Sequence, residues 1–329
     1  MGILRKFKGK IILIDQEKKY FSQGSEIFSQ SNLKKEKIIK LPVSIFMKTL
    51  MRFHLISRML RLGVHHFIYD GKGGYYCIYN KKCARFSSNG ELIGKPLNLI
   101  GGRPLRVDLY NDELIYGEYC SNQERNPVSI ISYNGFDQKK LLQIKNVRHI
   151  HTVRCYQDKI YFSTGDYKDE AGIWCWDGKT TTPIIRGSQQ TRAVDFMIIN
   201  EVILYGTDTP LEKNYIYKSD FKGNLEKLQN VSGSVFYMSY QANRYWLATV
   251  IEPSDVNTSH YIELWCSSPH DLKKWELVEK FKKDIWHMKL FQYGQIQFPY
   301  GFDSSKDVVY FYLQGVNGSG YSVEYSIAY

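Results

Sequence analysis

Carboxylic side chains recur in this chain directly after short apolar runs. Glu118, Asp166, Asp208 and Glu252 follow Leu-Ile-Tyr-Gly, Phe-Ser-Thr-Gly, Leu-Tyr-Gly-Thr and Thr-Val-Ile, in that order. Neighbouring members are about 45 residues apart, the spacing of a repeated structural unit. Carboxyl groups gathered in one pocket can serve as acid, base or nucleophile. The alternative is that each acid accepts hydrogen bonds from the backbone of its own turn.

Arginine and histidine precede the neighbouring apolar runs, as in Arg103-Pro104-Leu105-Arg106 and Arg148-His149-Ile150-His151. On a strand, His149 and His151 would leave the same face, because alternate side chains share a face. Three interpretations of this pair stay open. The histidines are hydrogen-bonded structural groups, or they contact substrate or transfer protons, or they ligate a divalent metal ion. The last interpretation needs a third ligand, for which His66, His287 and Gln189 are candidates.

An internal repeat accounts for both sets of polar residues. Short apolar runs alternate with turn residues at a period of about 45, once residues 42–62 are set aside as an insertion. Four short strands per unit of this length are typical of β-propeller blades. We therefore expect an all-β chain, with residues 1–329 in a single propeller of seven blades, six being the alternative. The seven turn signals are Gly24, Asn89, Asn134, Asp177, Asp220, Asp271 and Asn317.

Strand positions follow from the same pattern. In the unit that starts at His149, we expect strands over 149–156, 159–163, 172–176 and 181–185. The first unit is short of one strand, so we expect the ring to close by borrowing a strand from residues 321–328 near the C-terminus.

The site prediction combines the repeat with strand geometry. In an antiparallel blade, the start of the first strand and the end of the second lie at one face, so polar residues at these two places converge on one mouth of the central funnel. The expected catalytic residues are His149, His151, Asp166, Asp208 and Glu252. The expected substrate contacts are Arg103, Arg106, Glu118, Gln189, Arg192, Asn214 and Tyr293. A divalent metal at the His pair, with His287 as a further candidate ligand, is the one cofactor considered.

The insertion at 42–62, between the first and second blades, is predicted to be helical. Phe46, Leu50, Phe53, Ile56 and Leu60 follow one another at spacings of four and three, which places them on one stripe of a helix. Two interpretations stay open: a helix that caps the propeller, or a basic amphipathic helix in peripheral contact with a membrane. The segment is too charged to span a bilayer.

Charge and cysteine usage limit the class of partner. The net charge of +11 indicates an acidic partner. Nucleic acid is disfavoured, because zinc-ligand spacings, RNA-recognition signatures and a basic tail are missing from the sequence. The six cysteines form no Cys-x-x-Cys pair and the first residues resemble no secretory signal. A cytoplasmic location follows, at the inner membrane face if the insertion contacts lipid. The sequence does not indicate the oligomeric state.

Two of the turns resemble a known motif. Ser87-Ser88-Asn89-Gly90 and the segment 267–275 are similar to degenerate Asp-boxes, the Ser-x-Asp-x-Gly-x-Thr-Trp turns of sialidase-like (BNR-repeat) propellers. As a repeat, the resemblance extends over the whole chain. The chain also resembles uncharacterised bacterial propellers that belong to surface-polysaccharide gene clusters and are described as glycosyl hydrolases. In the sialidase-like family these boxes are structural turns.

The resemblance implies a saccharide bound at the central funnel. Arg103-Pro104 lacks the spacer residue of the Phe/Tyr-Arg-x-Pro signature of true sialidases. We therefore expect a glycoside hydrolase or polysaccharide lyase that acts on an acidic surface polysaccharide or oligosaccharide. The alternative is a non-catalytic glycan-binding or scaffold propeller of a polysaccharide assembly complex. Nucleotide-binding loops and the serine-hydrolase elbow are missing from the sequence, which disfavours those classes.

Overall fold

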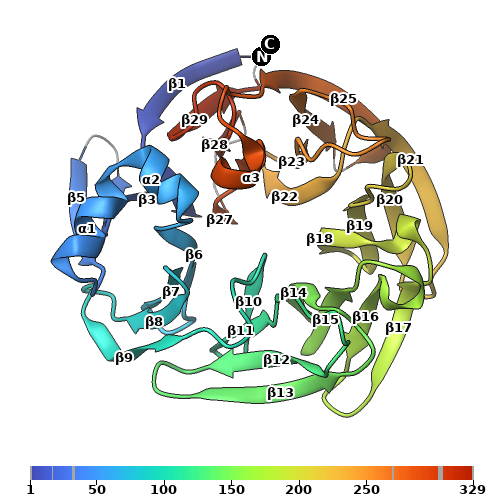
Figure 1. Cartoon of the computed structure of the whole chain (residues 1–329), viewed down its shortest axis with the longest axis horizontal. Helices are drawn as coiled ribbons and strands as arrows, with labels where there is room; N and C mark the ends of the chain where they lie inside the picture. Colours follow the sequence, from blue (N-terminus) through green and yellow to red (C-terminus); the bar gives the residue numbers. More distant parts are fainter. Residues whose placement is uncertain (1, 17, 32–33, 269, 303–306, 328–329) are drawn as a thin grey trace.

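The chain forms a ring of seven β-sheets around a central axis (Figure 1). The computed structural model describes residues 2–16, 18–31, 34–268, 270–302 and 307–327. Each sheet is one blade, with its innermost strand nearest the axis and its outermost strand at the rim. The prediction of an all-β propeller with seven blades is confirmed, and the six-blade alternative is wrong.

The strands run from the axis to the rim in each of the first three blades. Blade 1 contains β2 (Lys10–Asp15), β3 (Lys18–Gln23), β4 (Glu26–Ser31) and β5 (Lys34–Lys40). Blade 2 contains β6 (Val64–Tyr69), β7 (Tyr75–Tyr79), β8 (Lys82–Phe86) and β9 (Leu92–Asn98). Blade 3 contains β10 (Val107–Tyr110), β11 (Glu113–Gly117), β12 (Val128–Tyr133) and β13 (Gln138–Ile144).

The next three blades repeat this order. Blade 4 contains β14 (Ile150–Tyr156), β15 (Lys159–Thr164), β16 (Gly172–Trp176) and β17 (Thr181–Arg186). Blade 5 contains β18 (Ala193–Ile199), β19 (Val202–Thr207), β20 (Asn214–Asp220) and β21 (Leu225–Val231). Blade 6 contains β22 (Val235–Gln241), β23 (Arg244–Thr249), β24 (Tyr261–Ser268) and β25 (Asp271–Lys282). The strands expected in the unit that starts at His149 agree with β14 to β17 to within one residue at each end.

Blade 7 closes the ring with both ends of the chain. Its order from axis to rim is β26 (Gln295–Gln297), β28 (Val308–Gln314), β29 (Tyr321–Ser326) and β1 (Gly2–Lys8). The N-terminal strand β1 pairs antiparallel with β29, from Gly2 opposite Ser326 to Lys8 opposite Tyr321. The expected direction of strand exchange was therefore wrong: the N-terminus lends a strand to the last blade. The first blade has four strands of its own and gains β27 (Tyr300–Phe302) beside β2. The end of the expected segment, 328, lies outside the described residues.

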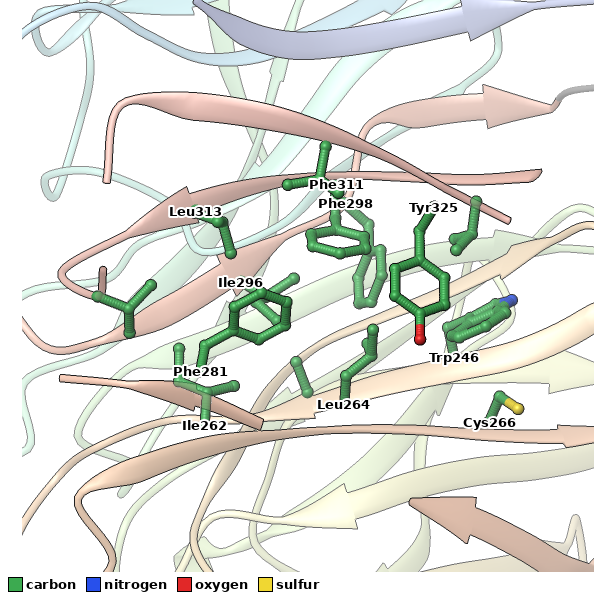
Figure 2. Close-up of a cluster of buried hydrophobic side chains, with 14 of the residues drawn as sticks. Trp246, Ile262, Leu264, Cys266, Phe281, Ile296, Phe298, Phe311, Leu313 and Tyr325 are labelled. Carbon is green, nitrogen blue, oxygen red and sulfur yellow. The ribbon is translucent and has the colours of Figure 1, made fainter. Parts of the chain in front are cut away.

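Hydrophobic packing between neighbouring blades holds the ring together. A cluster of buried side chains lies at each of the seven interfaces between blades. At the interface of blades 6 and 7, Trp246 and Leu264 pack against Phe311 and Tyr325 (Figure 2). The second or third strand of a blade is buried on both faces, as in β7 and β12, whereas the outermost strands are largely exposed. Continuous apolar runs in the sequence therefore mark strands between two interfaces.

The turn signals used to count blades belong to two kinds of turn. Five of them (Asn89, Asn134, Asp177, Asp220 and Asp271) lie at the hairpin between the third and fourth strands of blades 2 to 6. Gly24 and Asn317 lie between the second and third strands of blades 1 and 7, so their alignment with the others was wrong. The reason at Asn317 is the closure, because blade 7 takes its fourth strand from the N-terminus. In blade 1, the residues between the third and fourth strands, 32–33, lie outside the described residues.

The insertion forms two short helices, α1 (Ile45–Arg52) and α2 (His54–Met59), in the connection from β5 to β6. The Ser44 hydroxyl caps α1 by accepting the Met47 N–H at 3.2 Å. The expected apolar stripe is not the buried face, because Phe46 and Phe53 are 69% and 57% exposed. The buried residues of the two helices are instead Met51 in α1 and Arg58 in α2.

Arg58 and Gln292 connect the insertion to the segment that precedes β26 of blade 7, with the Gln292 amide donating to the Arg58 carbonyl at 2.6 Å. Arg58 forms an ion pair with Asp284 and donates to the carbonyl oxygen of Phe291, in the short helix α3 (Met288–Phe291). The insertion thus covers part of the ring, as the capping interpretation requires, while its apolar stripe stays exposed. Contact of that stripe with a membrane stays a prediction. Among the described helices, none has the length and apolar character needed to cross a bilayer.

Cysteine behaves as expected of unpaired thiols. Each of the six is free, with Cys77, Cys83 and Cys266 buried and the other three half-buried. Burial raises the pKa of Cys266 to about 11. A thiol with such a pKa is protonated at neutral pH and a poor nucleophile.

Closure of the ring can be tested at Ser322, which is buried beside the junction of β1 and β2. Its hydroxyl donates to the Gly9 carbonyl at 2.8 Å and accepts the Ile11 N–H at 2.8 Å. Ser322→Ala leaves both backbone groups without this partner, so we expect the free energy of unfolding to fall by about 1–3 kcal/mol. Chemical denaturation measures this change. Ser88→Ala, at an exposed turn, is the control and should stay within about 0.5 kcal/mol of wild type; equal effects would contradict the assigned role.

Candidate functional site

Blades 4 and 5 bring the central residues of the predicted site to one mouth of the funnel. His149 precedes β14 and Asp166 follows β15, and the register places Ile150 opposite Thr164. In the next blade, Arg192 precedes β18 and Asp208 follows β19. The geometric argument from antiparallel strands is therefore confirmed: first-strand starts and second-strand ends meet at one face.

A β-bulge shapes the start of β14. The pairing with β15 shifts between Ile150 and Thr152, so His151 has no opposite residue. Similar shifts occur near the start of β2, β6, β18 and β22. Such bulges re-aim side chains, and they are frequent beside functional sites.

Gly165 makes the turn that presents Asp166. Its φ of 71° lies in the left-handed region. A Cβ at this position would lie 2.1 Å from the carbonyl oxygen of Glu170. The backbone turn that places the Asp166 carboxylate therefore requires glycine at position 165.

His149, His151 and Asp166 form a buried triangle of donor atoms. The two Nε2 atoms are 2.8 Å apart, and Asp166 Oδ1 lies 3.4 Å from each of them. Each Nδ1 faces a backbone carbonyl, that of Cys120 at 3.1 Å and that of Ala193 at 2.9 Å. Within the described part of the chain, this is the one group of three His, Cys, Asp or Glu residues found close enough to share a metal ion.

Two arginines hold the carboxylate of this triangle. Arg148 Nη1 lies 2.6 Å from Asp166 Oδ2, and Arg192 Nη2 lies 3.2 Å from Oδ1. Arg192 also pairs with Asp208, at 2.9 Å from its Nη2 to Oδ2. Burial would raise the pKa of Asp166, but the two adjacent histidine rings and the charge of Arg192 hold it well below its usual value. Asp166 is therefore an anion at every pH at which the fold is expected to persist.

Histidine and tyrosine complete this wall. Burial lowers the pKa of His149, against the opposing effect of the adjacent Asp166 carboxylate. The Tyr119 ring packs on the His149 imidazole, with 4.4 Å between ring centroids. Burial raises the pKa of Tyr119 to about 12, so its hydroxyl keeps its proton at neutral pH.

Glu252 is the third carboxyl of the mouth and differs from the other two. It follows β23, beside an isolated bridge between Ile251 and Gly294. Burial, and secondarily the charge of Asp208, raises its pKa to about 7, while a hydrogen bond with Tyr293 opposes the shift. Glu252 is therefore a carboxyl that exchanges its proton near neutral pH.

A cavity of about 610 Å³ occupies the funnel beside this cluster. Its lining includes seven basic side chains and, among the described residues, neither Asp nor Glu. The basic residues are Lys10, Arg61, Lys81, Arg103, Arg106, Arg148 and Lys289. Six aromatic rings line it as well: Tyr119, Phe236, Tyr237, Tyr293, Phe298 and Tyr300. The cavity is therefore a basic pocket with aromatic walls, and the carboxylates lie outside its lining.

Several of the expected site residues lie away from the triangle. The Glu118 carboxylate accepts a hydrogen bond from the N–H of Ser129, which lies on β12 of the same blade, at 2.6 Å. Asn214 lies in a buried hydrogen-bond network with Thr209 and Asn257. His287 is exposed at the start of α3 and is not part of the group that could share a metal. Arg103 donates to the Arg61 carbonyl at the edge of the funnel cavity.

Among the described residues, Asp166 is the acid that lies beside the His pair, whereas the candidate third ligands His66 and His287 are not part of this group. His66 is hydrogen-bonded to the Pro104 carbonyl and the Tyr300 hydroxyl. Gln189 contacts the triangle through its side-chain amide nitrogen, which donates to the backbone carbonyl of Asp166 at 2.8 Å. Sequence reasoning did not assign roles to Arg148 or Tyr119, although each is the immediate neighbour of an expected site residue.

Comparisons with known proteins identify the fold and no family. No family model matches the chain, and no curated protein matches its sequence. Similar solved structures include the AfRom2 CNH domain, with a TM-score of 0.56 and 10% identity over 99% of this chain and 96% of that one. A second is the computationally designed Ika8 protein (0.54, 9%, 98% and 98%). A third is a chain in the Mitotic Checkpoint Complex (0.59, 6%, 99% and 95%). These likenesses concern the propeller fold alone, and the resemblance to sialidase-like propellers stays a prediction.

The raised pKa of Glu252 predicts a pH dependence of stability. Because the folded-state pKa, about 7, lies above the usual value of 4.5, the folded protein holds this proton more tightly than the unfolded chain. The contribution is present below pH 4.5 and is lost as the pH rises to about 7. Relative to Glu252→Gln, wild type should therefore lose on the order of 1–3 kcal/mol over this range. Denaturation at several pH values measures the difference. Glu91→Gln, at an exposed turn, controls for loss of a carboxyl; a wild-type curve parallel to Glu252→Gln would contradict the shift.

Proposed function

We propose that this chain binds an acidic saccharide in the cavity of its central funnel. The observation that carries the proposal is Arg106, which is 9% exposed and forms no ion pair among the described residues. Its guanidinium lies 4.1 Å from the centre of the Tyr300 ring, and its buried Nε has no hydrogen-bond partner. A buried cation without a counter-ion costs folding free energy. An anionic ligand in the cavity would supply the missing charge.

The rest of the lining supports a sugar acid as that anion. Seven basic side chains and no described carboxylate surround the cavity, so a negative group is favoured throughout it. Aromatic rings suit the apolar face of a sugar, and arginine forms paired hydrogen bonds with a carboxylate.

The size of the basic region supports an oligosaccharide over a single sugar. A second cavity, of about 770 Å³, lies between the helical insertion and blades 1 and 7. It shares Lys10, Arg61 and Gln292 with the funnel cavity, so the two adjoin. Its lining adds further basic groups, including Lys40 and Arg52. A chain of acidic sugars could therefore extend from the funnel under the insertion.

Arg106→Met tests the binding proposal. Loss of a charge-assisted hydrogen bond costs about 1.5–3 kcal/mol, so affinity for a uronate oligosaccharide should fall by about 10- to 100-fold. Because the substitution removes an unpaired buried charge, the free energy of unfolding should stay equal or rise. Calorimetric titration with oligogalacturonate, and with a neutral oligosaccharide of the same length, measures the first effect.

The matched control is Arg186→Met, on the outer strand β17, where the guanidinium lies over Trp174. It removes the same charge away from the funnel and should leave the affinity unchanged. Uronate affinity that is insensitive to Arg106→Met, or equal for neutral and acidic sugars, would overturn the proposal.

A second candidate function, glycoside hydrolysis, is favoured by Glu252 alone. A general acid must hold its proton at the working pH, and Glu252, with its pKa near 7, has that property. Elimination would instead need His149 or His151 as the base. Their Nε2 atoms face one another and Asp166, so the proposal assigns neither of them that role.

Hydrolysis predicts new reducing ends in a uronate polymer incubated with the protein, and a rate that falls as the pH rises through about 7, where Glu252 loses its proton. Glu252→Gln should lower the rate by at least about 100-fold while binding persists. Unsaturated-uronate absorbance would indicate a lyase. Tight binding without either product would identify a non-catalytic glycan-binding propeller.

A further inference from the structure

The hydrogen bonds around the His149–His151 pair determine which nitrogens carry protons. Both Nδ1 atoms face backbone carbonyls, at 3.1 Å and 2.9 Å, and a carbonyl can only accept. Each neutral imidazole therefore has its one proton on Nδ1 and a bare lone pair on Nε2. Those two Nε2 atoms are 2.8 Å apart. Two lone pairs at this distance repel each other, so the arrangement requires a positive charge between them.

The third donor atom distinguishes a metal ion from a shared proton. A proton bridges two atoms, whereas here Asp166 Oδ1 is equidistant from both nitrogens, at 3.4 Å. A point in the plane of the three atoms would lie about 1.9 Å from each of them. A point displaced by less than about 1 Å from that plane lies about 2.0–2.1 Å from all three, which are the distances of zinc to imidazole and carboxylate ligands.

The surroundings of the triangle are those of a metal centre. Ligating histidines characteristically donate their second N–H to a carbonyl or carboxylate, which orients the ring, and both histidines do so here. The charges of Arg148 and Arg192 are matched by Asp166 and Asp208, so the cluster does not repel a cation as an excess of arginine would. His149 lines the funnel cavity, which gives an ion a route to the site.

We infer that His149, His151 and Asp166 bind one divalent transition-metal ion, with zinc the best match to the ligand set and distances. Three protein ligands leave a fourth position for water or for an oxygen of a bound ligand. The inference does not depend on the proposed saccharide function, because it rests on the three donor atoms and their hydrogen bonds alone.

Metal titration of untagged protein, treated with chelator and then desalted, tests this inference. With zinc chloride, calorimetry should show one ion per chain at a dissociation constant below micromolar. With cobalt chloride, the visible spectrum should show the intense bands of four-coordinate cobalt. His149→Gln and His151→Asn should each weaken zinc binding at least 100-fold, and Asp166→Asn at least 10-fold.

The matched control is His287→Gln, which removes an exposed histidine near the funnel and should leave zinc binding unchanged. Since a variant of a buried residue can misfold, the wild-type cobalt spectrum provides a readout that needs no substitution. Binding of less than one zinc ion at micromolar concentration, or no cobalt bands, would overturn the inference. So would an NMR signal from a proton shared by the two Nε2 atoms in excess zinc.

Discussion

The constraint on which this structure depends is that no blade can bury both of its faces alone. Each sheet lies between two others, and a hydrophobic cluster fills every interface, so the ring is stable only when it is closed. The cluster between blades 7 and 1 is the smallest among the described residues. There the pairing of β1 with β29 and the Ser322 hydrogen bonds add backbone contacts that the other interfaces do not need.

Ring closure also fixes the positions of the residues at the mouth of the funnel where blades 4 and 5 meet. The ends of packed strands cannot move far, so the donor atoms from blade 4 and the paired charges from blade 5 are held in place without a ligand. Buried charges at the mouth are matched in pairs, with Arg192 between Asp166 and Asp208. The adjoining cavity is unbalanced instead, since Arg106 has no acidic partner among the described residues. The arginines and aspartates of the mouth pair with one another, whereas the adjoining cavity requires an anion.

Much of this architecture was predictable, because blade packing leaves a regular pattern in the sequence. Apolar runs bounded by turn residues predicted the strands of blade 4, and antiparallel pairing predicted that His149, Asp166, Arg192 and Asp208 would meet. The direction of strand exchange at the seam was not predictable, since either end of the chain can supply a rim strand. Asn317 was misaligned for the same reason.

Other features depend on contacts between segments far apart in the sequence. Which face of the insertion is buried depends on Asp284 and Phe291, more than 200 residues away, so the apolar stripe was misleading. Asp166 is the third donor because of the left-handed turn at Gly165, and backbone carbonyls set the histidine protons. Residue types do not show where backbone carbonyl groups lie. The sequence therefore left three interpretations of the His pair open, and the geometry favours one of them.

The bulge near the start of the inner strands separates two demands on the same chain. The bulge accommodates an extra residue before the regular strand pairing begins. Residues at the mouth can therefore change in number or direction while the side chains that face the next blade keep their alternation along the strand. Selection on ligand recognition and selection on packing therefore act on different positions. A propeller built in this way can acquire a new specificity through its inner-strand starts without putting its seven interfaces at risk.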